Sequence, residues 1–234
     1  MLKNIELYNF KSHKATNFDF KGQSAAIIGP NASGKTNLLE SIYYSFLTKP
    51  LAGAQADVIN RDADFTKVIT TIDLDKPYKF EYRLKNSQGS ISRTVKLNDV
   101  KHKPSELIGM QPVVVFVPDD VQIISGGPNF RRNYLNSMII QTQAEYLQAI
   151  NRYQKLLGQR NRLLYGIKNN LSVNRDQLFV YNLQMSLPIE QIYRHRYLIM
   201  DYLNSSLGEI YSSISGGNDK IHIEYLPTLP KDKD

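Results

Sequence analysis

Residues 29–36 read GPNASGKT, a spacing of glycines, lysine and threonine that suits a loop holding the phosphates of a nucleotide. In such a loop, backbone N–H groups and the positive end of a following helix attract phosphate oxygens. Lys35 would reach the β- and γ-phosphates, and the Thr36 hydroxyl would coordinate Mg²⁺. We therefore predict a site for ATP and Mg²⁺ composed of Gly29, Pro30, Asn31, Ala32, Ser33, Gly34, Lys35, Thr36 and Asn37.

The segments on either side of this loop have the order that it requires. Residues 24–28 are a short apolar run that ends at a glycine, and they predict a strand. Residues 35–47 place apolar side chains at helical intervals, and they predict a helix. A strand before the loop and a helix after it are the context in which a phosphate-binding loop works.

Further strands are predicted where apolar residues alternate along the chain. Residues 5–10 and 18–20 each predict one near the start. Residues 68–97 contain three alternating stretches separated by the turn segments DKP and NSQG, which predicts an antiparallel meander. The valine-rich run at 112–117 predicts a buried strand, and residues 104–108 predict a short helix before it.

The apolar spacing becomes helical after residue 127. Between residues 128 and 164 it is close to heptad spacing, so we expect one long helix or two helices broken near Gly158. A second helical stretch covers about residues 177–210, with an interruption at Pro188. The segment IHIEYLP predicts a final strand.

Composition limits the partners and the kinds of site. The formal net charge is +7, which favours a polyanionic partner such as nucleic acid, an anionic membrane or a phosphorylated ligand. No stretch has the apolar length of a secretory signal or of a membrane span, so we expect a cytoplasmic protein. The chain has no cysteine, and its four histidines lack ligand spacing, so neither disulfides nor a zinc site are expected.

Hydrolysis of ATP also needs an acidic residue at the end of an apolar strand, to hold Mg²⁺ and position water. The segment VVVFVPDD offers two carboxylates, but Pro118 separates them from the predicted strand. We expect Asp119 or Asp120 to cap a turn or a helix; the alternative for Asp119 is a Mg²⁺-holding role. The segment IISGGPN leads into a predicted helix but not into the acid-ended strand of an ATPase signature, and ISGGNDK leaves only about eighteen residues, 217–234, so we interpret both as glycine-rich turns.

Longer stretches of the sequence resemble the RecF family of bacterial DNA replication and repair proteins, in the SMC-like branch of ABC ATPases. The stretches are LKNIELYNFKSH, GPNASGKTNLLESIYYSF, VVFVPDD, GGPNFRRNYLN and YLQAINRYQKLLGQRNRLL. Many ATPases share the phosphate loop, so the specific resemblance rests on the F-x-P-x-D element, on Arg131 with Arg132, and on QRNRLL. It implies an α/β P-loop head of the ABC-ATPase type, with an antiparallel β subdomain and a helical second lobe, incomplete at its C-terminal end.

The resemblance also implies a division of the chain and a way of working. Residues 1–127 would form the ATP-binding lobe, residues 128–215 the helical lobe, and residues 216–234 a return strand and tail leading toward a C-terminal ATPase segment. In the family, ATP brings two heads together around DNA, and the protein acts with RecO and RecR to direct RecA loading at gaps. Ala32 replaces a usual loop glycine, and Lys11 stands where the family often has arginine.

The family's signature motif and acid-ended Walker B strand lie further along than residue 234. We therefore assign no catalytic residue within this chain, and we expect it to hydrolyse ATP negligibly by itself. Complete members of the family are slow ATPases. Alternatives are a head of the SMC, RecN or OLD kind, or an interaction module that works without nucleotide.

A basic stretch without acids lies between Glu145 and Asp176, with tyrosines among its arginines and lysines. Such a stretch can follow DNA phosphates without reading sequence. Alternatives are a solvated helix face, a surface for a protein partner, or, for Arg131 and Arg132, capping of carbonyls or pairing with aspartates. The predicted DNA contacts are Arg131, Arg132, Arg152, Lys155, Arg160, Arg162 and Lys168.

Overall fold

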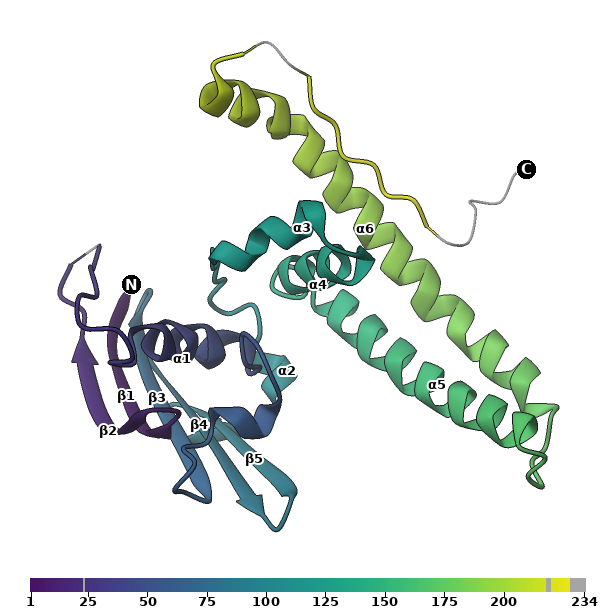
Figure 1. The fold of residues 1–234 in the computed structure, drawn as a ribbon, viewed down its shortest axis with the longest axis horizontal. Helices are drawn as coiled ribbons and strands as arrows, with labels where there is room; N and C mark the ends of the chain where they lie inside the picture. The colour runs from purple at the N-terminus through teal and green to yellow at the C-terminus, as the bar shows by residue number, and fades with distance from the viewer. Residues whose placement is uncertain (23, 218–219, 228–234) are drawn as a thin grey trace. The chain divides into compact units, whose positions relative to one another are not determined.

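The computed structural model describes residues 1–22, 24–217 and 220–227 of the chain (Figure 1). The chain divides into two compact units, Met1–Asp120 and Val121–Asp234, which we call unit 1 and unit 2. The division falls slightly before the lobe boundary that we expected after residue 127. Each unit is described by itself.

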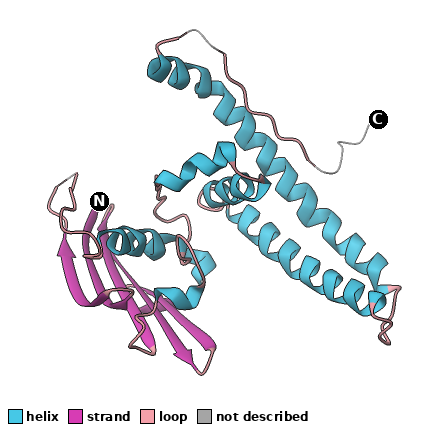
Figure 2. Cartoon of the chain, viewed as in Figure 1, coloured by secondary structure: helices cyan, strands magenta, loops and turns pink. Residues whose placement is uncertain are grey.

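Unit 1 is built on a six-stranded sheet with the order β2-β1-β3-β4-β5-β6 (Figure 2). All neighbouring strands are antiparallel. The strands predicted near the start of the chain and the predicted meander are confirmed. The strands are β1 Leu2–Phe10, β2 His13–Asp19, β3 Phe65–Asp73, β4 Pro77–Ser87, β5 Ser90–Leu97 and β6 Val100–His102.

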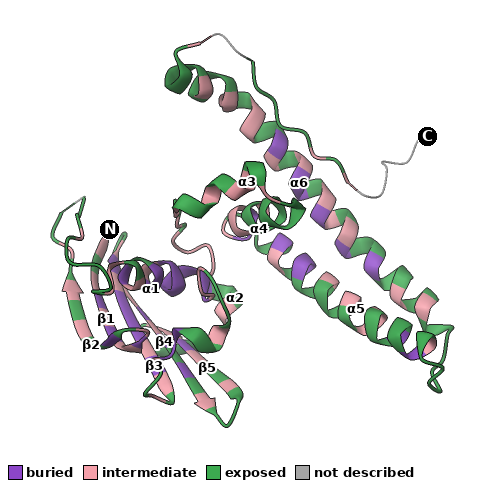
Figure 3. Ribbon diagram, viewed as in Figure 1, coloured by how far each residue is buried: buried purple, intermediate pink, exposed green. Residues whose placement is uncertain are grey.

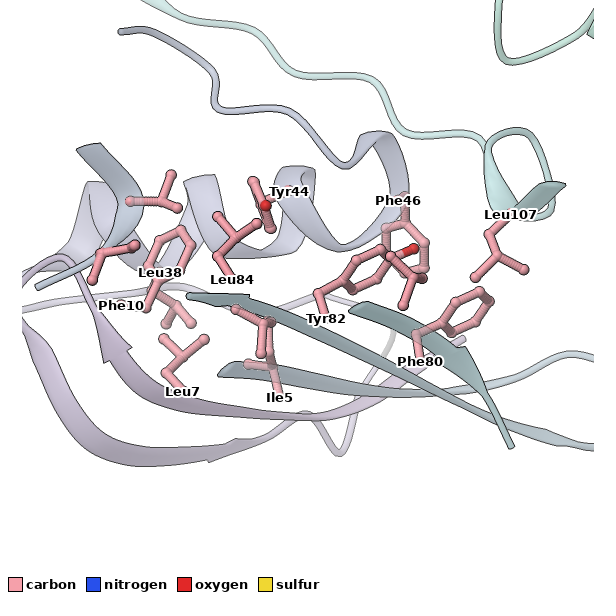
Figure 4. Close-up of a cluster of buried hydrophobic side chains, with 14 of the residues drawn as sticks. Ile5, Leu7, Phe10, Leu38, Tyr44, Phe46, Phe80, Tyr82, Leu84 and Leu107 are labelled. Atoms are coloured by element: carbon pink, nitrogen blue, oxygen red, sulfur yellow. The ribbon is translucent and has the colours of Figure 1, made fainter. Parts of the chain in front are cut away.

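The helix α1, Lys35–Leu47, covers one face of this sheet and has the predicted bounds. Strand side chains alternate between faces, so Ile5 and Leu7 enter the core together with Tyr44 of α1 (Figure 4). The Ser45 and Thr70 hydroxyls share a buried hydrogen bond of 2.6 Å, which ties α1 to β3. The single buried face of the sheet therefore fixes the position of the helix that follows the phosphate loop.

Three short elements complete unit 1. They are the 3₁₀ turn η1, Gln55–Val58, the helix α2, Pro104–Leu107, and the 3₁₀ turn η2, Pro118–Val121. The short helix predicted at 104–108 is confirmed as α2. The Asp120 carboxylate accepts a hydrogen bond of 2.9 Å from the Val117 N–H, which confirms the expected turn-capping role.

Two segments predicted as strands, residues 24–28 and 112–117, are not strands in the structure. The six strands of unit 1 already pair with one another, and neither segment joins their ladder. Both are irregular segments, and each packs against the core through one partly buried residue, Ile27 in the first and Val113 in the second. Their other side is exposed: Ile28 is 92%, Val114 96% and Phe116 87% exposed. The apolar runs were identified correctly, but a strand also needs a neighbour that supplies hydrogen bonds.

Unit 2 is helical, and α5 packs along α6 with their buried residues between them (Figure 3). Gly158 does not break a helix; the break comes at residues 140–143, where α4 ends. Pro188 does not interrupt α6 either. A proline inside a helix lacks the N–H bond and crowds the carbonyl four residues earlier, yet α6 runs unbroken through Pro188, whose side chain is buried. The helices are α3 Gln122–Ser125, α4 Pro128–Ile139, α5 Ala144–Lys168 and α6 Gln177–Ser215.

The predicted final strand IHIEYLP is an extended segment without strand pairing in the described part of the chain. The Asn204 side chain takes the place of a partner strand, because it donates to the Ile223 carbonyl at 2.8 Å and accepts from the Ile223 N–H at 2.9 Å. The segment is thereby fastened to α6. The expectation for residues 216–234 otherwise falls partly on residues 218–219 and 228–234, outside those described.

The sheet core of unit 1 gives a first testable prediction. Phe80 is fully buried, and its ring lies edge-on to the Phe46 ring with centroids 5.7 Å apart. We expect Phe80→Ala to reduce the free energy of unfolding of unit 1 by about 3–5 kcal/mol, because it leaves a cavity. Urea titration followed by hydrogen exchange should show lost protection in β3 and β4. Val100→Ala, at an exposed position, is the control and should change stability by less than about 0.5 kcal/mol; equal effects would contradict the assigned core.

Candidate nucleotide-binding site

The phosphate loop ends at Gly34, which directly precedes α1. Gly34 has a φ of 93° and Ala32 a φ of 65°, so the loop contains two left-handed residues. No side chain caps the start of α1, and its first turn has no acidic residue. The first N–H groups of the helix and its positive dipole end therefore remain available to an anion. This is the feature that a triphosphate requires.

Lys35 bends back over the loop. Its ammonium group donates hydrogen bonds to the carbonyl oxygens of Gly29 and Pro30, at 2.8 and 2.6 Å. The charge is thus held beside the predicted phosphate position. The Thr36 side chain is exposed at the start of α1, where it is open to a metal ion bound with the nucleotide.

The turn between β1 and β2 holds the other side of the loop. The His13 ring nitrogen Nε2 lies 3.1 Å from the Gly34 carbonyl, and Asn37 donates a hydrogen bond of 2.8 Å to Ser12 Oγ. A β-carbon on Gly34 would lie 2.7 Å from Ser12 Oγ and 2.8 Å from His13 Nε2. Position 34 therefore needs glycine for two reasons, the backbone conformation and the closeness of this turn.

An ion pair anchors the same turn to the interior of α1. The Lys11 ammonium contacts the buried Glu40 carboxylate, whose other oxygen accepts a bond of 3.3 Å from the Leu51 N–H. Lys11 has a φ of 48°, and its carbonyl accepts a hydrogen bond from the Asn60 side chain. Lys11 could be singled out from the sequence, but its partner Glu40 could not. On the predicted helix Glu40 lies outside the apolar face of Leu38, Ile42 and Phe46 at 100° per residue, so the spacing carried no signal for its burial.

A hollow with a volume of about 520 Å³ lies beside this turn. Lys11 and Ser12 line it from the turn, and residues of η1 and of the segment after it line the other side, with both charges present: Asp57, Asn60, Arg61 and Asp62. Ser12 also contacts the first turn of α1, so the hollow adjoins the loop. Arg61 was missed in the sequence because nothing in its spacing connects it to the loop.

The predicted DNA contacts fall into separate groups. Arg131 donates to the carbonyl oxygens of Gly126 at 2.9 Å and Ile123 at 3.3 Å, which confirms the capping alternative. Arg132 donates to the Asn129 side chain at 3.1 Å, and Arg160 donates to the Asn182 side chain of α6 at 2.8 Å. These three arginines already bind partners within unit 2.

The remaining basic residues of the set are exposed on α5. At 100° per residue, Arg152, Lys155 and Arg162 fall within an arc of about 80°, whereas Lys168 lies in the last turn, outside that arc. The structure therefore reduces the predicted basic stretch to one exposed stripe of three residues, with Lys168 apart from it. The stripe belongs to unit 2 and the loop to unit 1.

Two kinds of feature are absent from the described residues. They contain no cluster of three or more His, Cys, Asp or Glu side chains that could hold a metal ion. Within the same residues, no helix combines the length and the apolar character needed to cross a membrane.

Comparison with known families defines the class of protein. A family described as an AAA domain matches residues 4–187, and the chain belongs to this family. The match includes the loop, the sheet of unit 1 and α5.

The relatives are more specific. The chain is 32% identical to the DNA replication and repair protein RecF of Agathobacter rectalis, over 98% of this chain and 63% of the relative. It is 30% identical to the protein of the same description from Bacillus cereus strain AH820, over 97% of this chain and 60% of the relative. The chain is thus similar to RecF proteins and spans about three fifths of the length of these relatives.

Solved structures support the same relationship. RecF-ATP and RecF-ATPrS, both described as recombination mediator proteins of the RecFOR pathway, match with a TM-score of 0.84. They are 28% and 27% identical, and each match covers 92% of this chain and 58% of the solved chain. The predicted α/β fold with an antiparallel sheet and a helical lobe is confirmed.

The contact between Gly34 and the β1–β2 turn can be tested with a matched pair of variants. Gly34→Ala and Gly89→Ala both place a side chain at a positive φ, 93° and 86°, but only the first meets atoms within 4 Å. We expect Gly89→Ala to destabilise unit 1 by about 1–2 kcal/mol from the backbone conformation alone. Gly34→Ala should reduce the free energy of unfolding by distinctly more than Gly89→Ala does, because Ser12 and His13 must also move. Urea unfolding measures both, and equal losses would show that the turn does not press on the loop.

Proposed function

We propose that this chain is an ATP-responsive, DNA-binding part of a DNA replication and recombinational repair protein. The observation that carries the proposal is the uncapped start of α1 behind a loop that already holds Lys35 in place. The similarity to RecF, including structures solved as RecF-ATP, supports the same conclusion. Nucleotide would act here through binding and assembly more than through fast chemistry.

The residues fit a Mg²⁺-bound triphosphate. Free N–H groups at the start of α1 would receive phosphate oxygens, and Lys35 would exchange its two loop carbonyls for the β- and γ-phosphates. Thr36 would hold Mg²⁺, which would neutralise phosphate charge.

DNA is the proposed macromolecular partner, and the exposed stripe of Arg152, Lys155 and Arg162 on α5 is its proposed contact. Three cations on one helix face can follow a phosphate backbone without reading bases. By its likeness to RecF, the protein would bind single- or double-stranded DNA at gaps, form an ATP-dependent dimer, and act with RecO and RecR in loading RecA. These partners are proposed by likeness to relatives of which this chain spans about three fifths.

Nucleotide binding can be tested by titrating the chain with ATP and Mg²⁺ in a calorimeter. We expect Lys35→Ala to weaken binding by at least about tenfold, because a charge-assisted contact to phosphate is lost. Lys21→Ala, an exposed lysine before the loop, is the control and should bind like the unmodified chain. Phosphate release should be negligible in all three, and turnover that disappears in Lys35→Ala would contradict a purely binding role.

DNA binding should depend steeply on salt. Replacing Arg152, Lys155 and Arg162 by alanine should reduce the slope of log affinity against log salt by about 2.7 for duplex DNA, at roughly 0.9 per phosphate contact. A matched control replaces the exposed lysines Lys85, Lys101 and Lys103 of unit 1, and it should retain the slope. Fluorescence anisotropy with a labelled duplex measures both, and identical slopes would exclude the α5 stripe as a phosphate contact.

A further inference from the structure

A cavity in unit 2 has no part in the function proposed above. It has a volume of about 630 Å³ and is walled by α4, α5, α6 and residues 225–227. This volume is within the range of sites that hold small molecules. Among the described residues that line it, Arg132 and Arg196 are basic and none is acidic.

Arg196 is a buried cation whose bonding partners are all neutral. It is 8% exposed, and it donates to the Tyr146 hydroxyl at 3.0 Å, the Tyr225 hydroxyl at 2.9 Å and the Asn136 side-chain oxygen at 3.0 Å. Its neighbour His195, by contrast, lies 3.9 Å from the Glu145 carboxylate. Within the described part of the chain, no carboxylate forms an ion pair with Arg196. A buried charge without a counter-ion is unfavourable, so this site favours an anion.

The guanidinium of Arg196 also has donors to spare. A guanidinium has five N–H groups, and the three bonds above use one on each nitrogen. One N–H on each terminal nitrogen is therefore outside these bonds. Two N–H groups match the two oxygens of a carboxylate, and a carboxylate carries the single charge that balances one arginine.

The rest of the cavity suits an apolar group next to that anion. Tyr153, Ile192 and Leu226 line it with aromatic and aliphatic surface. Arg132 is exposed and lines the cavity from α4, where it adds a second positive charge. A DNA phosphate fits less well, because a nucleotide would have to enter whole to reach an arginine that is 8% exposed.

We infer that this cavity binds a partner protein through an aspartate or glutamate side chain that is followed by an apolar residue. The carboxylate pairs with Arg196, and the apolar residue packs on Tyr153 and Ile192. The net charge of +7 attracts such an acidic segment. The site lies wholly in unit 2, so its occupation requires neither ATP nor DNA.

The probe is the peptide acetyl-Asp-Leu-Phe-amide, compared with acetyl-Asn-Leu-Phe-amide, which lacks only the charge. Each is titrated into the ¹⁵N-labelled 234-residue chain, and the Arg196 Nε–H signal is followed by NMR. We expect the aspartate peptide to shift this signal and to bind at least about tenfold more tightly than the asparagine peptide, the effect of one charged hydrogen-bonded pair. Equal binding of the two peptides, or no shift with either at millimolar concentration, would overturn the inference.

Two substitutions separate this site from a general effect of charge. Arg132→Ala should weaken binding of the aspartate peptide several-fold. It removes the second cation of the cavity and leaves the hydrogen bonds of the buried Arg196 in place. Arg194→Ala removes an exposed arginine that does not line the cavity, and it should leave binding unchanged. Equal losses in both variants would contradict the site. A single-stranded oligonucleotide that shifts the Arg196 signal when the aspartate peptide does not would assign the cavity to nucleic acid and refute the inference.

Discussion

The ion pair between Lys11 and Glu40 ties the turn after β1 to the interior of α1, and the shape of the phosphate loop depends on that tie. Glu40 is buried in the helix, so its charge has to be met from outside the helix. Lys11 meets it from a turn in which its backbone has a positive φ, and the next two residues of that turn, Ser12 and His13, lie against Gly34. Pairing within the sheet fixes the position of β1. The Lys11–Glu40 ion pair then ties the turn after β1 to α1, and this turn contacts the end of the phosphate loop, which is distant in sequence.

Much of unit 1 could be predicted from the sequence, because its strands, its helix and its loop are each indicated by patterns among residues that are close together in the chain. Alternation predicts the meander, helical spacing predicts α1, and the GPNASGKT spacing predicts the loop. The contacts that hold the loop could not be predicted in this way. Lys11 with Glu40, and Ser12 and His13 with Gly34, are each more than twenty residues apart, and no period in the sequence connects them. The division of the basic stretch into paired arginines and an exposed stripe likewise depends on partners such as Asn182, on another helix.

The two wrong strand predictions and the wrong final strand have one physical cause. Composition and apolar runs report that a segment prefers to be extended and half-buried, but the hydrogen-bond ladder of a strand is a property of two segments. Residues 24–28 and 112–117 each pack a residue against the core but have no neighbouring strand to pair with. The Ile223 segment shows a third outcome, in which the amide of Asn204 supplies both a donor and an acceptor to a single residue. An apolar run therefore predicts that one face of a segment is buried. Whether the segment pairs as a strand depends on a second segment that the run does not identify.

The continuity of α6 through Pro188 has a mechanical consequence. A helix of 39 residues is about 58 Å long at 1.5 Å per residue. Arg196 lies near its middle and Asn204 nearer its end, so the cavity and the fastened Ile223 segment share one rod. Because no break separates the two positions, a force on the Ile223 segment acts on the same continuous helix that carries Arg196, about 12 Å away along its axis at 1.5 Å per residue.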